Sequence, residues 1–330
     1  MMSSVSIIVP CFNEERYIKN CIESIINANI DDFELILVDG GSQDRTVEII
    51  EEYQNIYSFI KLHHNPKKFT PISMNIGIEA SQGSYIFIIS AHAEYQSDYF
   101  TTLVEEIQRL DANCVGGVLN TEVKNSNLKS NSIREILTHR FGVGNADFRT
   151  GGTEVKEVDT VAFGCYTKET FDKFGLYDEK LIRNQDIELN KRIINGGGKI
   201  YLIPSVNATY YARENFIDLA KNNFSNGKWN ILTAYYTKTF NSLSLRHFIP
   251  LIFVLSLVLP LVLSLFNINF LWIALLSLGS YLSLVIMSSL KSKDSSFFYL
   301  VVSFLTLHLS YGLGSLIGIF SVIIKYIKRS

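Results

Sequence analysis

The sequence of 330 residues lacks an excess of charge and lacks paired cysteines. Its formal net charge is −2, so no electrostatic attraction favours nucleic acid as a partner, and none is expected. Its four cysteines are far apart along the chain, which matches neither a zinc-binding pattern nor a disulfide framework. Reduced, buried thiols are therefore expected, and these are usual in the cytosol.

A secretory leader is missing as well. Met1 is followed within a few residues by a short apolar run, Val5–Val9, and no basic stretch precedes it. A signal peptide would begin with a positively charged region and continue into a longer apolar one. We therefore expect the N-terminal part of the chain to stay in the cytoplasm.

Charged side chains are nearly absent from the last quarter of the chain. Between His247 and Ile324 only Lys291, Lys293 and Asp294 are charged, whereas the first two hundred residues carry mixed charge throughout. Three apolar runs in this part are each long enough to span about 30 Å of hydrocarbon. They are Phe248–Phe266, Ile268–Leu290 and Phe297–Ile324. We predict a transmembrane domain over residues 247–330.

The basic residues around the apolar runs favour one orientation. With the N-terminal domain in the cytoplasm, two spans return Lys291 and Lys293 to the cytoplasmic side, as the positive-inside rule expects. A third full span would leave Lys325 and Lys328 outside, and the third run also contains several glycines. The sequence leaves open whether this run spans fully, is broken, re-enters the membrane or lies partly at the interface. We predict a multi-pass protein of the cell inner (cytoplasmic) membrane.

Residues 205–246 form a segment that is basic and rich in aromatic side chains. From Asn207 to Arg246 there are five basic and two acidic residues. A stripe at helical spacing indicates an amphipathic helix lying on a bilayer surface. It consists of Phe216, Leu219, Ala220, Asn223 and Phe224. The alternative is a soluble helix packed on the N-terminal domain.

Residues 1–204 alternate between predicted strands and helices. Strands are predicted at the apolar runs 5–9, 34–38, 59–62 and 85–89, with amphipathic helices between them. This order is typical of an α/β fold with a mostly parallel sheet covered by helices. Two later polar or glycine-containing stretches, Lys124–Ser132 and Phe141–Thr153, are predicted to be loops. A helix over 184–195 and a strand over 199–203 follow.

Ligands bind such sheets at the carboxyl ends of the strands. Three polar clusters follow predicted strands there: Pro10–Glu14, Asp39–Asp44 and Ser90–Glu94. Carboxylates at these positions can accept hydrogen bonds from a nucleoside, and glycines let the backbone approach a ligand closely. For the second cluster, an ordinary turn with a helix cap at Asp44 is the alternative.

These clusters, with the strands before them, resemble family 2 glycosyltransferases of the GT-A fold. The matching segments are Val5–Pro10 with Asn13-Glu14, Val38–Thr46, Asn65-Pro66, Asn75–Gly77, Ala80–Gly83, Ala91–Tyr95 and Asn184–Leu189. Arg213, Asn226–Trp229 and His308–Gly314 are similar to the subgroup named for succinoglycan biosynthesis. The resemblance covers nearly the whole chain, but its motifs do not specify the acceptor.

The resemblance implies an inverting displacement, in which a general base takes the proton of an acceptor hydroxyl. Asp186 matches the position of the base, and Gln185 stands where the family usually has glutamate. A helix N-terminus favours an ionised carboxylate, so a low pKa is expected for Asp186. A helix cap is the alternative role for Asp186. Glu188, which helix geometry turns about 200° away, is the alternative base.

The resemblance also implies which residues bind the nucleotide-sugar. Asp39 is expected to face the nucleoside, with Pro10, Asn13 and Glu14 beside it. The full predicted set is Pro10, Asn13, Glu14, Asp39, Gly41, Asp44, Asn75, Ser90, Ala91 and Arg213.

The expected metal site departs from the family pattern. The family has an Asp-x-Asp-type motif after the fourth strand and the subgroup has Asp-Ala-His, but this chain has Ser90-Ala91-His92. Serine supplies no charge, whereas imidazole can bind a divalent ion. We predict His92 as the ligand of Mg²⁺ or Mn²⁺, with Glu94 in reserve. A strand-end histidine without a metal is the alternative.

We therefore expect a GT-A glycosyltransferase domain over residues 1–204, an amphipathic interfacial segment over 205–246 and a membrane domain over 247–330. The expected donor is a UDP-sugar, and the expected acceptor is a lipid-linked saccharide of exopolysaccharide or capsule biosynthesis. Two alternatives stay open. One is a polyprenyl-phosphate glycosyltransferase. The other, motivated by Ser90, is a catalytically impaired GT-A scaffold that binds nucleotide.

Overall fold

The computed structural model describes residues 5–144, 146–238, 245–290 and 295–328. The chain forms two compact units: an N-terminal unit of residues 1–120 and 147–211, and a C-terminal unit of residues 121–146 and 212–330. The segment 121–146, expected in the N-terminal domain, thus belongs with the C-terminal helices. The residues used to argue orientation, Lys291 and Lys293, lie outside the described part of the chain.

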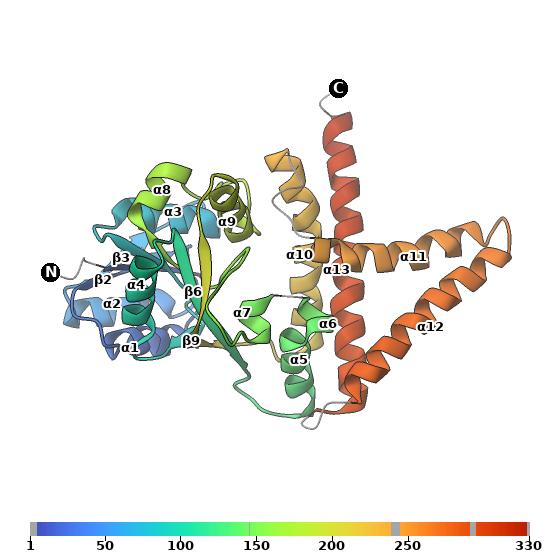
Figure 1. The fold of residues 1–330 in the computed structure, drawn as a ribbon, viewed down its shortest axis with the longest axis horizontal. Helices are drawn as coiled ribbons and strands as arrows, with labels where there is room; N and C mark the ends of the chain where they lie inside the picture. The colour runs from blue at the N-terminus through green and yellow to red at the C-terminus, as the bar shows by residue number, and fades with distance from the viewer. Residues whose placement is uncertain (1–4, 145, 239–244, 291–294, 329–330) are drawn as a thin grey trace. The chain divides into compact units, whose positions relative to one another are not determined.

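The N-terminal unit is built on a mixed sheet (Figure 1). Four strands that come early in the chain pair in parallel in the order β3-β2-β1-β4. They are β1 (Val5–Cys11), β2 (Phe33–Asp39), β3 (Ile60–His64) and β4 (Tyr85–Ile88). Beyond β4 the order continues β8-β6-β9-β5, and β7 pairs with β9. These later strands are β5 (Ala93–Tyr95), β6 (Cys114–Glu122), β7 (Lys156–Glu157), β8 (Cys165–Thr167) and β9 (Ile200–Tyr211).

The apolar side chains of the parallel strands alternate between two cores, one on each face of the sheet. Ile7 and Leu35 lie in one core, which α1 (Ile18–Ile26), α2 (Thr46–Ile56) and α4 (Tyr99–Arg109) cover. Their neighbours Ile8 and Ile36 lie in the other core, with residues of α3 (Thr70–Ala80), α8 (Lys168–Phe174) and α9 (Gln185–Asn195). Both faces are buried, so the strands are apolar almost throughout. The predicted α/β fold is confirmed.

The two predicted loops are wrong in part, because both stretches contain helices. α5 (Leu128–Thr138) begins within the first, and α6 (Arg140–Val143) and α7 (Asp147–Thr150) lie within the second. Asn127 caps α5 by accepting hydrogen bonds from the backbone N–H groups of Lys129 and Ser130, each at 3.0 Å. Few residues of α5 are apolar, and Ile133 and Ile136 are the ones buried in the core of the C-terminal unit. That short stripe is hard to recognise in a polar sequence.

The predicted strand at 199–203 is too short. β9 continues through Pro204 to Tyr211, because β5 pairs with its second half. The first seven residues of the expected interfacial segment therefore belong to the sheet. The helix predicted after them is present as α10 (Phe216–Thr237).

Three helical stretches of the C-terminal unit are long and apolar enough to cross a membrane. They are Leu245–Leu263, which includes α11 (Ile249–Leu263), α12 (Asn269–Ser289) and α13 (Phe297–Ile327). Much of their apolar surface is exposed, as at Trp272, which is 70 % exposed. Lipid is the natural environment for such a surface, so these helices mark a membrane protein. α13 is continuous, so it has no break at its glycines.

The helices α10 and α13 pack side by side (Figure 1). Gly314 and Gly318 of α13 face α10, whereas Gly312 faces Pro250 of α11. A Cβ atom on Gly314 would lie 2.0 Å from the carbonyl oxygen of Phe224, and one on Gly227 of α10 would lie 1.9 Å from that of Tyr311. Small residues allow this close approach of two helix backbones, as in many membrane helix pairs. The apolar stripe of α10 therefore has a protein partner in α13, which the prediction of a helix on a bilayer surface did not include.

Candidate active site

A cavity of about 370 Å³ opens in the N-terminal unit at the carboxyl ends of β1 and β4. Five of the predicted residues line it: Pro10, Glu14, Ser90, His92 and Asp186. They come from three separate parts of the chain, and the direction of the parallel strands brings the first two parts to one edge of the sheet. α9 supplies Asp186 from the C-terminal end of this unit's sequence.

Asn13 links the first two strand-end loops instead of lining the cavity. Its side-chain oxygen accepts a hydrogen bond from the backbone N–H of Gln43 at 2.8 Å, and its own N–H donates to Ser42 Oγ at 2.8 Å. The residue has a φ of 55°, a left-handed conformation that asparagine tolerates better than most residues. Asn13 therefore fixes the shape of the loop that carries Pro10 and Glu14.

Asp39 and Asp44 also organise backbone. Asp39 is only 2 % exposed, and its carboxylate accepts hydrogen bonds from the N–H groups of Gly41 at 2.9 Å and Ser42 at 3.1 Å. Asp44 accepts from the N–H groups of Thr46 at 3.0 Å and Glu15 at 3.1 Å. Neither carboxylate lines the cavity, although Gly40 between them does. Gly41, the glycine of the predicted set, does not line the cavity, and its predicted contact with the nucleotide-sugar stays a prediction.

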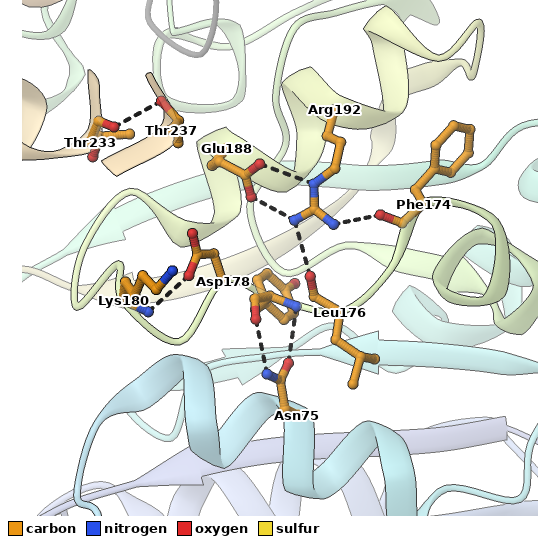
Figure 2. A network of polar contacts seen from close by, with 10 residues as sticks. Asn75, Phe174, Leu176, Asp178, Lys180, Glu188, Arg192, Thr233 and Thr237 are labelled. Carbon is orange, nitrogen blue, oxygen red and sulfur yellow. Dashed lines mark hydrogen bonds and ion pairs between the residues drawn. The ribbon is translucent and has the colours of Figure 1, made fainter. Parts of the chain in front are cut away.

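Asn75 is buried in α3, and both ends of its amide bind the backbone of Tyr177. The Asn75 side chain donates to the Tyr177 carbonyl at 2.9 Å and accepts from the Tyr177 N–H at 3.0 Å (Figure 2). The side chain of Tyr177 lines the cavity, but Asn75 does not. Asn75 therefore positions a wall of the cavity, and its predicted contact with the nucleotide-sugar stays a prediction.

Asp186 is the second residue of α9, whose N-cap Asn184 has a φ of 62° and turns the chain into the helix. The residue is exposed, and its carboxylate faces the cavity. Partial desolvation of the carboxylate by the protein atoms around it raises its pKa above the ordinary value. Hydrogen bonds from the backbone N–H groups and the positive charge of Arg149 offset part of that rise. The expected low pKa is therefore wrong, because desolvation outweighs the effects of the helix terminus and of Arg149.

Glu188, the alternative base, points into a different network. Its carboxylate accepts hydrogen bonds from Arg192 Nε at 3.0 Å and Arg192 Nη2 at 2.6 Å (Figure 2). The same guanidinium donates to the carbonyls of Phe174 and Leu176. Glu188 does not line the cavity. Its place in this network indicates that it anchors the loop before α9.

The loop after β4 brings His92 to Glu14. His92 Nδ1 and Glu14 Oε1 lie 3.1 Å apart, within hydrogen-bonding distance, and the two side chains are 34 % and 18 % exposed. The His92 ring also contacts Tyr210, with ring centroids 5.3 Å apart. Ala91 is buried at 2 % exposure, so it sets the direction of the loop and does not line the cavity.

Of the side chains at this end of the cavity, only His92 and Glu14 are suited to bind a divalent metal ion. The imidazole and the carboxylate are both ligands that Mn²⁺ accepts, whereas the Ser90 hydroxyl is neutral. Among the described residues, no group of three or more histidine, cysteine, aspartate or glutamate side chains could hold a metal ion. The reserve ligand Glu94 already accepts hydrogen bonds from Asn20 at 3.1 Å and Tyr211 at 3.0 Å. Glu14 is therefore a better second ligand than Glu94.

Two cations on the cavity wall were missed by the sequence reasoning. Lys68 follows β3, and Arg149 lies in α7. Lys68 is close to a segment of the family resemblance, Asn65-Pro66, which could have drawn attention to it. Arg149 falls in a stretch predicted to be a loop, so no periodic signal marks it. Arg213 belongs to the C-terminal unit, and its predicted contact with the donor stays a prediction.

Comparison with known proteins gives a consistent result. A family model described as "Glycosyl transferase family 2" matches residues 6–165. A dolichyl N-acetyl-α-D-glucosaminyl phosphate 3-β-D-2,3-diacetamido-2,3-dideoxy-β-D-glucuronosyltransferase of Methanococcus voltae is 32% identical, over 68% of this chain and 72% of that protein. The succinoglycan biosynthesis protein ExoA of Rhizobium meliloti is 27% identical, over 68% of each chain.

A solved structure is similar at the level of the fold. The crystal structure of GalNAc-T7 with UDP, GalNAc and Mn²⁺ matches with a TM-score of 0.51 at 17% identity, over 64% of this chain and 44% of that one. The fold and the relatives together define a glycosyltransferase of the GT-A class. Within that class, the chain belongs to glycosyltransferase family 2.

Proposed function

We propose that this glycosyltransferase transfers a sugar from a UDP-sugar to a lipid-linked saccharide, with inversion at the anomeric carbon. The observation that carries the proposal is the presence of Asp186 in one cavity with Ser90 and His92. Asp186 supplies a proton acceptor on one wall. Ser90 and His92 lie in the loop after β4, where the family resemblance places the donor diphosphate.

Asp186 acts as the general base in this proposal. Its ionised carboxylate takes the proton of the acceptor hydroxyl while the acceptor oxygen forms a bond to the anomeric carbon. The bond from that carbon to the diphosphate breaks, and its electron pair leaves with the diphosphate. A raised pKa suits this role, because a more basic carboxylate accepts a proton more readily once it is ionised. Attack opposite the leaving group inverts the configuration.

The nucleoside half of the donor is expected beside Pro10 and Gly40, which line the cavity. Asn13, Asp39 and Asp44 then support donor binding through the loops that they hold, as their hydrogen bonds to backbone suggest. His92 and Glu14 would hold Mg²⁺ or Mn²⁺. When bound, such an ion stabilises negative charge on the diphosphate.

The lipid-linked acceptor is supported by the helices and by the relatives. A membrane anchor keeps an active site close to acceptors that cannot leave the bilayer. The printed name of the Methanococcus voltae relative describes a dolichyl-phosphate-linked sugar as its acceptor, and that of the Rhizobium meliloti relative places it in succinoglycan biosynthesis. We propose exopolysaccharide or capsule biosynthesis, with the N-terminal unit on the cytoplasmic side of the cell inner membrane.

The proposal is tested by donor turnover with the full chain in lipid nanodiscs. UDP-sugars are offered with lipid-linked saccharides or with polyprenyl phosphate, and UDP release and glycolipid products are measured. Transfer to a saccharide acceptor is the expected result. Transfer to polyprenyl phosphate alone would favour the phosphate-glycosylating alternative. UDP binding without any turnover would favour a scaffold that the serine at position 90 has impaired.

A further inference from the structure

Arg149 occupies a position that the proposed mechanism does not yet use. Its guanidinium carbon lies 5.4 Å from the ring centroid of Phe148 and 5.4 Å from that of Tyr210. Contacts with two aromatic faces hold a guanidinium in place and leave its positive charge intact. All three side chains line the cavity, so the cation is arranged to meet a ligand there.

The neighbours of Arg149 place it beside the bond that breaks. The ring of Tyr210 also contacts His92, with centroids 5.3 Å apart. On the other side, the positive charge of Arg149 acts on the carboxylate of Asp186. Arg149 therefore lies near both the proposed base and the loop where the diphosphate is expected. The scissile bond joins the sugar to that diphosphate, so the guanidinium is near the atom on which charge develops.

The small number of candidate metal ligands makes a cationic side chain important at this point of the cavity. Ser90 supplies no charge where the family pattern has an acid, which leaves His92 and Glu14 as the candidate metal ligands. A metal ion held by two protein ligands is bound less tightly than one held by more. A permanent positive charge on the protein can stabilise a leaving diphosphate directly, and arginine suits phosphate because its donors form a planar fork.

We propose that Arg149 is a further catalytic residue, which donates hydrogen bonds to the β-phosphate of the donor and stabilises the departing diphosphate. This inference rests on the proposed function. As the acceptor oxygen bonds to the anomeric carbon and its proton passes to Asp186, the electron pair of the broken bond moves to a β-phosphate oxygen. Arg149 neutralises that oxygen and stays protonated throughout.

The test is calorimetric titration of the full chain in detergent with UDP, UMP and uridine in the presence of EDTA. Arg149→Gln should weaken UDP binding by about 10-fold or more, and should leave uridine and UMP binding nearly unchanged. The UDP affinity of Arg149→Lys should lie between those of the wild type and Arg149→Gln, because lysine keeps the positive charge but lacks the planar fork of donors. The matched control is Arg109→Gln, which removes an exposed guanidinium paired with Glu106 outside the cavity.

Unchanged UDP binding by Arg149→Gln, with wild-type binding intact, would overturn the inference and leave the proposed function standing. If only the binding of UDP-glucuronic acid weakened, while UDP and UDP-glucose were unaffected, the guanidinium would bind a sugar carboxylate and the diphosphate assignment would be wrong. Failure of the wild-type chain to bind UDP even with added Mn²⁺ in place of EDTA would instead refute the proposed function. A kcat that falls in Arg149→Gln more than the KM for acceptor rises would support a role in the leaving-group step.

Discussion

The two units of this chain use apolar residues in opposite ways. In the N-terminal unit, neighbouring strand residues such as Ile7 and Ile8 enter two different cores, and both are completely buried. In the C-terminal unit, large apolar residues such as Trp272 and Leu276 are 70 % and 72 % exposed, and glycines occupy the contact between α10 and α13. Apolar side chains therefore mark the interior of the first unit and the lipid-facing surface of the second.

This difference predicts where each unit is sensitive. The N-terminal unit should respond to changes of a single polar atom in its cavity, because the surrounding core excludes water. The C-terminal unit should tolerate such changes on its exposed helices and should respond to added volume where helices touch. The following variants test that contrast in order of expected effect.

The largest effect is expected from Asp186→Asn. The substitution keeps the size of the side chain but removes the basic carboxylate, so the transfer rate should fall about 10²–10⁴-fold. UDP affinity should change little. Glu188→Gln is the control, because Glu188 lies outside the cavity and pairs with Arg192. Near-normal turnover by Asp186→Asn, with loss in Glu188→Gln, would reverse the assignment of the base.

The metal requirement should depend on the loop after β4. His92→Ala should raise the manganese concentration for half-maximal activity, because it removes one of two candidate ligands. Ser90→Asp should lower that concentration, because a carboxylate adds a charged oxygen ligand. Manganese titrations of the two variants and the wild type measure both shifts. Activity that EDTA leaves unchanged, together with an unaltered titration for Ser90→Asp, would show that this loop holds no catalytic metal.

In the C-terminal unit, Gly314→Ala should destabilise the helix pair. The added Cβ would lie 2.0 Å from the backbone oxygen of Phe224, so α10 and α13 must separate, at a cost of about 1–3 kcal/mol in the free energy of unfolding. Gly279→Ala makes the same substitution in α12, where no atom lies within 4 Å of the new Cβ. Thermal unfolding in detergent should show a lower Tm for the first variant alone. Equal Tm values would contradict the proposed helix contact.

The smallest effect is expected in the pH dependence of turnover. Desolvation raises the pKa of Asp186, so the active ionised form is lost as the pH falls through a value above the ordinary one of about 3.9. Arg149 lowers this pKa, so Arg149→Gln should move the acidic limb of the kcat profile to higher pH. An acidic limb that does not move would mean that Arg149 does not act on the base.

The same raised pKa has a consequence for stability. Because the folded state binds the Asp186 proton more tightly than the unfolded state, ionisation costs stability, and this cost is fully present above the folded pKa. Asp186→Asn removes the ionisable group and should therefore raise the Tm at neutral pH. A lower Tm would indicate that the carboxylate is stabilised by contacts stronger than its desolvation.

The sheet could be predicted from the sequence because runs such as Val5–Val9 are buried on both faces and end at polar loops. The helix α5 could not, because its buried stripe is little more than Ile133 and Ile136 within a polar segment. The limits of β9 also escaped prediction, since Pro204 lies inside a strand that continues to Tyr211.

The sequence predicted where the site lies, but it predicted the contacts of the individual residues less well. A motif containing Asp39 and Asp44 does not reveal whether a carboxylate faces a ligand or a backbone N–H, and in this structure both accept hydrogen bonds from backbone. Arg149 belongs to no recognisable motif. It lines the cavity because of the path that the chain takes before β7, which the sequence does not reveal. The rise in the pKa of Asp186 comes from desolvation in the folded cavity, which local helix position cannot indicate.

The central claim is that the cavity containing Asp186 performs an inverting transfer from a UDP-sugar. Its most direct test is NMR of the glycolipid product formed by the full chain in nanodiscs from a UDP-sugar of known anomeric configuration. The account predicts a product with the opposite configuration, formed by the wild type and not by Asp186→Asn. A product with the donor's configuration, or equal product formation by Asp186→Asn, would contradict it.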